Sequence, residues 1–285
     1  MESTVVLSEI QSMFLSGLSG YYPDNEIRNI FYIASEHLLN YSKIDILLKS
    51  NEPISAENTK KFNQMLIRLR KWEPIQYITG FTEFYALTFR VDSRVLIPRP
   101  ETEEFVQWII HEETGSSLNL LDIGTGSGCI AVSLAVNLPE ASVSAFDISA
   151  EALVVARMNA QINRADVNFF TRDVLDSNIA LPGKYQVMVS NPPYVRKLEK
   201  ALMRRNVLDF EPGIALFVPD KDALLYYRSI ALLGLKYLKD GGALYLEINE
   251  NYPHEMVRLL ESTGFYGVEI RRDLNGKARM VRARK

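Results

Sequence analysis

Residues 119–128 of this 285-residue chain read Asn119-Leu120-Leu121-Asp122-Ile123-Gly124-Thr125-Gly126-Ser127-Gly128. The run begins like a buried strand and ends in three alternating glycines, after which helical spacing resumes from Cys129 to Leu138. Glycines between a strand and a helix let main-chain amides and the helix N-terminus approach a ligand without clashes from Cβ atoms. The stretch therefore predicts the first strand, turn and helix of an α/β domain that binds a ligand at the turn.

The ligand at this turn is predicted from the glycine spacing and from the next strand. The dinucleotide pattern G-x-G-x-x-G requires a glycine at position 129, which is Cys129, whereas G-x-G-x-G is satisfied. The strand predicted from Ser142 to Phe146 is followed by Asp147, 19 residues after Gly128. A carboxylate at this place can accept hydrogen bonds from both ribose hydroxyls of an adenosine. Together with the glycine spacing, it favours an adenosine-containing cofactor other than NAD. Capping of the following helix is the alternative role of Asp147.

The rest of the domain alternates between strands and helices, as a doubly wound, mostly parallel sheet requires. A helix is predicted from Ala150 to Asn163 and a strand from Val167 to Thr171; the loop after that strand carries Asp173, which either holds an adenine amino group or forms a turn. The remaining predictions are a strand at 185–190, a helix at 222–237, a strand at 243–248, a helix at 253–262, and a terminal antiparallel hairpin at 268–272 and 278–284. Residues 195–219 are predicted to be a long irregular loop, and their basic residues a solvated face.

The strand at 185–190 runs directly into Asn191-Pro192-Pro193-Tyr194. Two prolines end the strand in a rigid corner, and the carboxyl end of a buried strand is where open α/β sheets place ligands. The Asn191 side-chain oxygen and the Pro192 carbonyl can each accept one hydrogen of an NH2 group, while the Tyr194 ring packs against its flat face. The corner therefore predicts a site for a planar amide or amino group, with a plain proline-rich turn as the alternative.

The N-terminal region has a different pattern. Residues 1–80 show helical spacing, with apolar residues on one face of each of two helices (Ile27, Ile30, Phe31, Ala34 and Phe62, Met65, Leu66, Leu69). Ser42 and Ser55 stand at N-cap positions, and Gly80 follows the last helix. A period of two at 81–97 predicts a β-hairpin linker. We therefore predict a small helical domain at 1–80, a hairpin at 81–97 and the α/β domain at 98–285.

Composition limits the possible functions. A formal net charge of −3 gives no electrostatic signature of duplex nucleic acid binding, so no direct nucleic-acid contact is expected. A single cysteine excludes an internal disulfide, and the three histidines lack metal-ligand spacing, so no metal is expected. No basic leader and no run of membrane-spanning length is present, which predicts a soluble, cytoplasmic protein.

Two motifs together resemble a known class of enzymes. Residues 122–128 resemble motif I of class I S-adenosylmethionine-dependent methyltransferases, and residues 191–194 resemble the motif with which these enzymes bind an amino group. Within that class, Pro98-Arg99-Pro100-Glu101-Thr102-Glu103, Phe210-Glu211-Pro212 and the N-terminal helical domain are similar to the release factor glutamine methyltransferases, the PrmC or HemK family. The resemblance spans nearly the whole chain.

The resemblance implies a function and a set of site residues. It implies transfer of a methyl group from S-adenosyl-L-methionine to the glutamine side-chain nitrogen of the Gly-Gly-Gln motif in class I peptide chain release factors, and substrate recognition by the helical domain. Asn191, Pro192 and Tyr194 would be catalytic, and residues 191–194 would hold the glutamine. The cofactor would be bound by residues of four segments: Gly124, Thr125, Gly126, Ser127, Gly128; Asp147, Ile148; Asp173, Val174; and Asn191. Val174 stands where some members have an aromatic residue.

Other functions fit the same motifs. A glutamine of a ribosomal protein presents the same amide, and the exocyclic amino groups of adenine and cytosine also present a planar NH2 once the base is flipped out. A cofactor-binding adaptor without activity would lack the asparagine or tyrosine of the tetrapeptide, and both residues are present.

Overall fold

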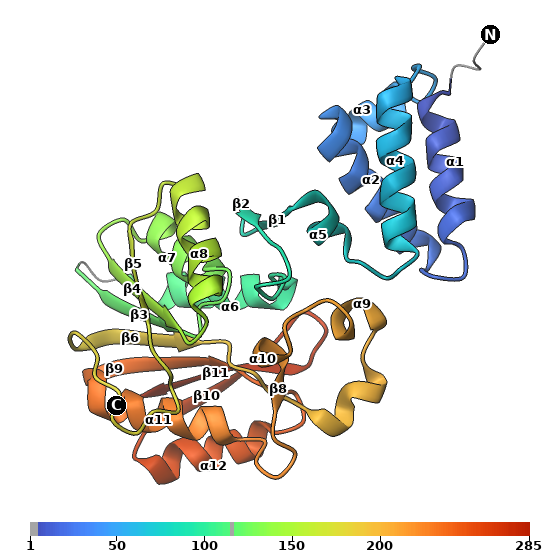
Figure 1. Cartoon of the computed structure of the whole chain (residues 1–285). Helices are drawn as coiled ribbons and strands as arrows, with labels where there is room; N and C mark the ends of the chain where they lie inside the picture. The colour runs from blue at the N-terminus through green and yellow to red at the C-terminus, as the bar shows by residue number, and fades with distance from the viewer. Residues whose placement is uncertain (1–4, 115–116) are drawn as a thin grey trace. The chain divides into compact units, whose positions relative to one another are not determined.

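The structure, a computed structural model, describes residues 5–114 and 117–285. The described chain divides into two compact units (Figure 1). The helical unit comprises residues 5–80 together with Arg204–Phe210, and the sheet unit comprises Phe81–Met203 together with Glu211–Lys285. Apolar side chains form a separate buried cluster in the helical unit, so each unit has a hydrophobic core of its own.

The helical unit contains α1 (Leu7–Leu18), α2 (Asp24–Leu39), α3 (Lys43–Leu48), α4 (Ala56–Leu69), α5 (Ile75–Thr79) and the short α9 (Arg205–Leu208). Both apolar faces predicted from the sequence are buried, around a cluster of three phenylalanine rings (Phe14, Phe31, Phe62). The hydroxyls of Ser42 and Ser55 accept hydrogen bonds from backbone amides at the starts of α3 and α4, and Gly80 ends α5 at a φ of 81°. These local predictions are confirmed.

Residues 204–210 belong to the helical unit although they interrupt the sequence of the sheet unit. Arg204 Nη1 lies 2.9 Å from Glu26 Oε2 of α2, and the Arg205 guanidinium lies 5.7 Å from the centre of the Trp72 ring. An ion pair with α2 and a cation–π contact with the turn after α4 therefore join this segment to the rest of the helical unit.

The sheet unit is built on a seven-stranded sheet of order β10-β11-β9-β6-β3-β4-β5. Its strands are β3 (Asn119–Ile123), β4 (Ser142–Asp147), β5 (Val167–Thr171), β6 (Tyr185–Ser190), β9 (Leu238–Glu247), β10 (Tyr266–Arg272) and β11 (Ala278–Arg284). Pairing is parallel from β9 through β5, whereas β11 is antiparallel to both β9 and β10. The predicted doubly wound sheet with a C-terminal antiparallel hairpin is confirmed.

Helices cover both faces of this sheet (Figure 1). On one face, α6 (Pro100–Glu112), α7 (Cys129–Asn137) and α8 (Ala150–Ile162) contribute to one buried apolar cluster; on the other, α11 (Leu225–Tyr237) and α12 (Pro253–Thr263) contribute to a second. Leu120 and Leu121 of β3 point into different clusters, as alternate residues of a strand must. A hairpin of β1 (Phe81–Phe84) and β2 (Leu87–Arg90) is tied to α8 by Asn159, whose Oδ1 accepts from the Arg90 amide at 2.6 Å.

The prediction of an irregular loop at 195–219 is wrong. The stretch contains β7 (Val195–Arg196), the 3₁₀ helix η1 (Lys197–Leu202), α9, α10 (Gly213–Leu216) and β8 (Phe217–Val218), and β7 pairs with β8 in parallel. Four of these elements have only two to four residues, and η1 is a single short 3₁₀ helix, so none shows a hydrophobic period of its own, which explains why the sequence did not reveal them. Within residues 5–114 and 117–285, no helix has the length and apolar character needed to cross a membrane.

Candidate active site

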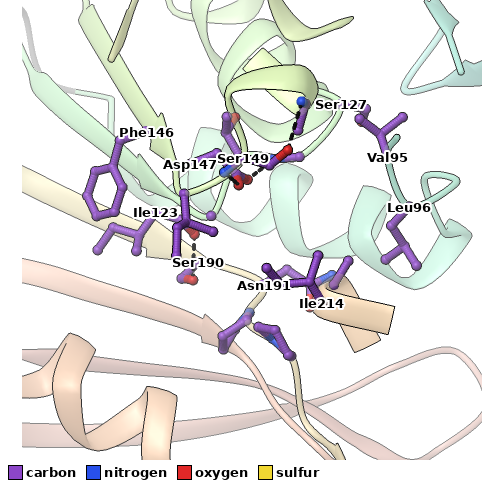
Figure 2. Close-up of a pocket in the computed structure, with 18 of the residues that line it drawn as sticks. Val95, Leu96, Ile123, Ser127, Phe146, Asp147, Ser149, Ser190, Asn191 and Ile214 are labelled. Atoms are coloured by element: carbon purple, nitrogen blue, oxygen red, sulfur yellow. Dashed lines mark hydrogen bonds between the residues drawn. The ribbon is translucent and has the colours of Figure 1, made fainter. Parts of the chain in front are cut away.

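The candidate site lies where the order of the sheet reverses. β3 and β6 are adjacent and parallel, and Ile123 pairs with Ser190 in their register. The glycine loop (residues 124–128) and the Asn-Pro-Pro-Tyr corner (residues 191–194) therefore leave the same edge of the sheet side by side, and the Ser190 hydroxyl donates to the Ile123 carbonyl at 2.7 Å. One pocket is lined by residues of both segments (Figure 2). This is the crevice where open α/β sheets bind ligands.

The glycine loop presents main chain to this pocket. Gly124 and Gly126 have φ values of 71° and 54°, and a Cβ atom added to either would meet no atom within 4 Å. Gly128 is different, because a Cβ atom there would lie 3.1 Å from the Cβ of Ala156 in α8. The first two glycines therefore leave space for a ligand, whereas the third allows close packing of helices; Gly128 is not among the pocket-lining residues.

Asp122 is a buried residue that fixes the glycine loop by a hydrogen bond. Its side chain is 1% exposed, and the Thr125 hydroxyl donates to its Oδ2 at 2.6 Å. Burial raises the pKa of this carboxyl to about 7. Asp122 does not line the pocket, whereas residues 124–127 of the loop do, so the contact of Asp122 with Thr125 shapes the loop.

Asp147 faces the pocket at the end of β4 (Figure 2). Its Oδ2 accepts from the Gly126 amide at 2.8 Å and its Oδ1 from the Ser149 amide at 2.9 Å. Burial raises the pKa of its carboxyl, and these amides act in the opposite direction. Ser149, not Asp147, caps α8, because the Ser149 Oγ accepts from the Ala152 amide. The alternative capping role of Asp147 is therefore wrong, and Ile148 beside it also lines the pocket.

Asp173 and Val174 line the pocket beyond Asp147. The Leu175 amide donates to Asp173 Oδ1 at 2.8 Å, so this aspartate forms the turn that its sequence context also suggested. Tyr226 and Ile230 of α11 also line the pocket. Burial raises the pKa of Tyr226, and the negative charge of Asp173 adds to that effect. A flat aromatic wall beside a carboxylate suits a planar base with an amino group.

At the corner, Asn191, Pro192 and Pro193 line the pocket and Tyr194 is not among the lining residues. The Asn191 side-chain NH2 donates to the Thr102 hydroxyl at 3.3 Å. The Tyr194 hydroxyl points into the protein and donates to Glu247 Oε1 at 3.2 Å, and both burial and the Glu247 charge raise its pKa. The corner thus presents an amide to the pocket and uses its tyrosine hydroxyl inside the protein.

Several lining residues were not predicted as site residues. They come from the segment before α6, from α6 itself and from α10 (Val95, Leu96, Pro98, Arg99, Thr102, Ile214, Ala215). The fully buried carboxylate of Glu211 joins these segments, since it accepts from the Ile97 amide at 3.1 Å and from Arg99 at 2.6 Å. The only sequence signal for these residues was the pair of motifs at 98–103 and 210–212, which resemble those of the family. Their contact spans 112 residues or more, so the sequence alone did not indicate that they meet.

Comparison with known proteins assigns the chain to a class and a family. Residues 102–209 match the Methyltransferase small domain, and residues 18–80 match the PrmC N-terminal domain. The chain is 42% identical to the release factor glutamine methyltransferase of Flavobacterium psychrophilum, across 98% of this chain and 99% of that one. It is 43% identical to the Bacteroides thetaiotaomicron protein of the same description, across 97% and 99% of the two chains.

Among solved structures, a methyltransferase from Pyrococcus furiosus superposes with a TM-score of 0.54, covering 78% of this chain and 98% of that one at 15% identity, which shows a shared fold. The fold, the pocket at the sheet's reversal point and the domain match together define a methyltransferase. The near-full-length identity is more specific: this chain belongs to the release factor glutamine methyltransferase family. The predicted family and enzyme class are confirmed.

Proposed function

We propose that this chain transfers a methyl group from S-adenosyl-L-methionine to the side-chain nitrogen, N5, of the glutamine in the Gly-Gly-Gln motif of class I peptide chain release factors. The names of the Flavobacterium psychrophilum and Bacteroides thetaiotaomicron relatives specify a release factor glutamine as their acceptor. The exact atom and motif come from the family resemblance of the sequence. The contacts described below support both the choice of cofactor and the choice of an amide acceptor.

The pocket residues fit S-adenosylmethionine. The open space over Gly124 and Gly126 admits the amino acid part of the cofactor close to main-chain amides. The Asp147 carboxylate, positioned by two amides, has lone pairs left for ribose hydroxyls, and Asp173, Val174 and Tyr226 form the wall for adenine. When bound, the cofactor supplies a methyl group on a positively charged sulfur atom.

The observation that carries the choice of acceptor is the direction of the Asn191 amide. Its NH2 group is engaged by Thr102, so its carbonyl oxygen is the atom offered to a substrate. Pro192 and Pro193 have no amide hydrogen, so these two residues supply carbonyl acceptors and no backbone donor. An NH2 group can therefore donate one hydrogen to Asn191 Oδ1 and the other to the Pro192 carbonyl.

These two acceptors also explain how an amide nitrogen can react. Its lone pair is delocalised into the neighbouring carbonyl, so the nitrogen is a poor nucleophile that must be held in line with the methyl group. Acceptors on both N–H groups hold the nitrogen and favour its pyramidal form in the transition state. The nitrogen that has gained the methyl group is positively charged and strongly acidic, so its proton leaves to Asn191 or to water. No strong side-chain base is required.

Methyl transfer to separate acceptors tests the proposal. The chain is incubated with labelled S-adenosylmethionine and with release factor, ribosomes, DNA or RNA, and the label is located by mass spectrometry. We expect label on the Gly-Gly-Gln glutamine of release factor. Label on a ribosomal protein or a nucleic acid instead would contradict the proposal.

A matched pair of variants tests the role of Asn191. Asn191→Ala should lose at least about 100-fold in kcat, because one acceptor of the reacting NH2 group is gone, while S-adenosylmethionine binding remains. Asn137→Ala, whose amide bonds to a carbonyl within α7, should keep full activity. Near-normal transfer by Asn191→Ala would exclude the proposed role.

A further inference from the structure

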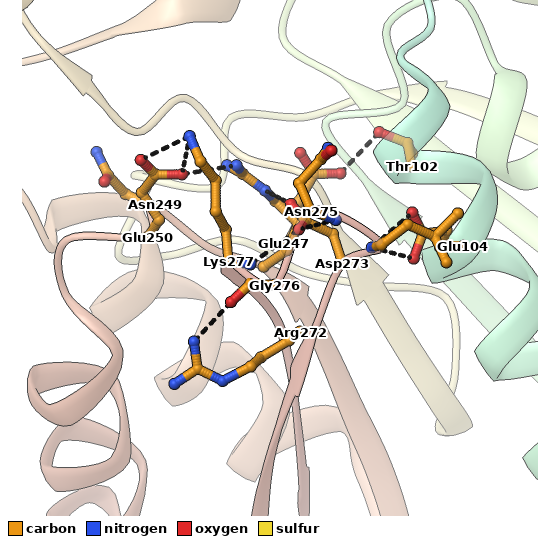
Figure 3. Close-up of polar contacts among 12 residues, drawn as sticks. Thr102, Glu104, Glu247, Asn249, Glu250, Arg272, Asp273, Asn275, Gly276 and Lys277 are labelled. Atoms are coloured by element: carbon orange, nitrogen blue, oxygen red, sulfur yellow. Dashed lines mark hydrogen bonds and ion pairs between the residues drawn. The ribbon is translucent and has the colours of Figure 1, made fainter.

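A buried hydrogen-bonded relay lies behind Asn191. The Asn191 NH2 donates to the Thr102 hydroxyl at 3.3 Å, and this hydroxyl donates to Glu247 Oε2 at 2.7 Å. Thr102 in α6 is 2% exposed and Glu247 at the end of β9 is 1% exposed. Figure 3 shows the hydroxyl of Thr102 directed at the carboxylate of Glu247. The relay joins three elements that lie far apart in the sequence.

The order of donors in the relay fixes the direction of the Asn191 amide. A threonine hydroxyl has a single hydrogen, and here that hydrogen is given to Glu247. The hydroxyl oxygen can then only accept, so it selects the NH2 end of Asn191 and turns Oδ1 toward the pocket. An asparagine amide has almost the same shape after a 180° flip, so packing alone does not choose between the two orientations.

Glu247 is held as an acceptor by groups on several elements. The Tyr194 hydroxyl donates to Glu247 Oε1 at 3.2 Å, so both carboxylate oxygens accept a hydrogen bond from a hydroxyl group. Burial raises the pKa of Glu247, whereas the Thr102 hydroxyl, the positive charge of Arg279 in β11 and the Tyr194 hydroxyl act in the opposite direction, and the Glu101 charge adds to the rise. The Thr102 and Tyr194 hydroxyls and the Arg279 charge favour the ionised form, and in that form the carboxylate has no hydrogen to donate and sets the polarity of the whole relay.

Arg279 is itself fixed by the turn of the C-terminal hairpin. Its guanidinium lies 3.2 Å from Asp273 Oδ2 and 3.0 Å from Glu250 Oε2, and Lys277 also pairs with Glu250 (Figure 3). The carboxylate of Glu104 in α6 accepts from the backbone amide of Leu274 in the same turn. The turn is therefore anchored to the helix that carries Thr102.

We propose that Thr102 and Glu247 are positioning residues, which select the orientation of the Asn191 amide that accepts a substrate N–H and exclude the flipped one. The proposal rests on the function proposed above. In the flipped amide, an NH2 group would face the substrate NH2, and two donors cannot form a hydrogen bond. Loss of the relay should therefore lower the fraction of competent enzyme without affecting the parts of the pocket that bind the cofactor.

Three variants separate this role from a packing role. Thr102→Val keeps the volume and replaces the hydroxyl by a methyl group, so the Asn191 NH2 group loses its acceptor and the flipped amide becomes the favoured one. We expect kcat on release factor to fall about 10- to 100-fold, the scale on which an unpaired buried donor shifts an equilibrium. Thr102→Ser keeps the hydroxyl and should restore kcat to within about threefold of the wild type, whereas a packing role would not be rescued by the smaller side chain. In Glu247→Gln, the new NH2 group can donate to Thr102 and reverse the relay, so kcat should fall as in Thr102→Val.

Two controls accompany the kinetics. Thr263→Val removes a helix hydroxyl that bonds to the Leu259 carbonyl in α12, and it should leave kcat unchanged. The affinity for S-adenosylhomocysteine, measured by calorimetry, should stay within about threefold of the wild-type value in Thr102→Val and Glu247→Gln, which also shows that both are folded. A kcat within about threefold of the wild type in both variants would overturn the proposal.

An NMR measurement tests the relay even if the proposed function fails. The side-chain NH2 signals of Asn191, assigned by their loss in Asn191→Asp, report its hydrogen bond to Thr102. These signals should move in Thr102→Val and in Glu247→Gln and stay in place in Thr102→Ser. Unchanged signals in the first two variants would disprove the relay. If the wild-type protein methylates no glutamine and the variants still show the expected NMR shifts, the proposed function alone would be disproved.

Discussion

The substitution Asp122→Asn should change how the stability of the sheet unit depends on pH. Asp122 is buried beneath the glycine loop, and burial raises the pKa of its carboxyl to about 7. An aspartate in the unfolded chain has a pKa of about 3.9. The native state therefore holds this proton more tightly than the unfolded state does. The resulting stability is fully present below about pH 3.9 and is lost as the pH rises through 7.

Linkage gives the size of this effect. Between pH 5 and pH 8, a shift from about 3.9 to about 7 lowers the free energy of unfolding by about 2.5 kcal/mol. The asparagine introduced by the substitution does not titrate, and its carbonyl oxygen can still accept from the Thr125 hydroxyl. The raised pKa values of Asp147 and Glu247 affect both proteins and largely cancel in the difference. The variant should therefore gain about 2.5 kcal/mol relative to the wild type between pH 5 and pH 8.

Urea unfolding at a series of pH values measures this difference. The chain has two tryptophans, and replacement of Trp72 by phenylalanine in both proteins leaves the buried Trp108 of α6 as a fluorescence reporter of the sheet unit. A difference in stability between variant and wild type that is constant within about 0.5 kcal/mol from pH 5 to pH 8 would refute the reasoning. It would mean that Asp122 titrates near its ordinary pKa despite its burial.

Further predictions concern the cofactor site and the substrate. Asp147→Ala should raise the Kd for S-adenosylmethionine at least about tenfold, since charge-assisted bonds to the ribose are lost; an unchanged calorimetric Kd would remove Asp147 from the site. Gly128→Ala should lower the Tm more than Gly126→Ala, because only the former brings a Cβ within 3.1 Å of Ala156; equal Tm values would contradict this. Intact release factor should be methylated much faster than a short Gly-Gly-Gln peptide if the helical domain contributes to docking, and equal rates would count against that contribution.

Regular elements of the sheet unit were predictable because each is long enough to show its own period. The strand predicted at 167–171 coincides with β5, and the helix predicted from Ala150 begins at that residue in α8. The glycine loop and the corner were placed together by one rule, that parallel strands direct their carboxyl ends to the same edge. The residues predicted to bind the cofactor were placed on this edge by the same rule, and most of them line the pocket.

The relay could not be predicted, because its contacts depend on tertiary packing. Thr102 and Glu247 are 145 residues apart, and a threonine in the first turn of a helix is read from sequence as an ordinary helix start. Tyr194 shows the same limit. Its place in the tetrapeptide suggested a ring facing the substrate, and only the fold reveals a buried glutamate within reach of its hydroxyl.

The membership of residues 204–210 in the helical unit affects how the protein can be dissected. A cut after Gly80 divides the sequence between the two predicted domains, but it separates residues 204–210 from the helices they pack with. The longer fragment would then leave Arg204 and Arg205 without their partners in the helical unit, and the shorter one would leave Glu26 and Trp72 without these cations. A truncated enzyme that fails to work would thus have lost more than residues 5–80, because the contacts that hold Arg204–Phe210 would be gone as well.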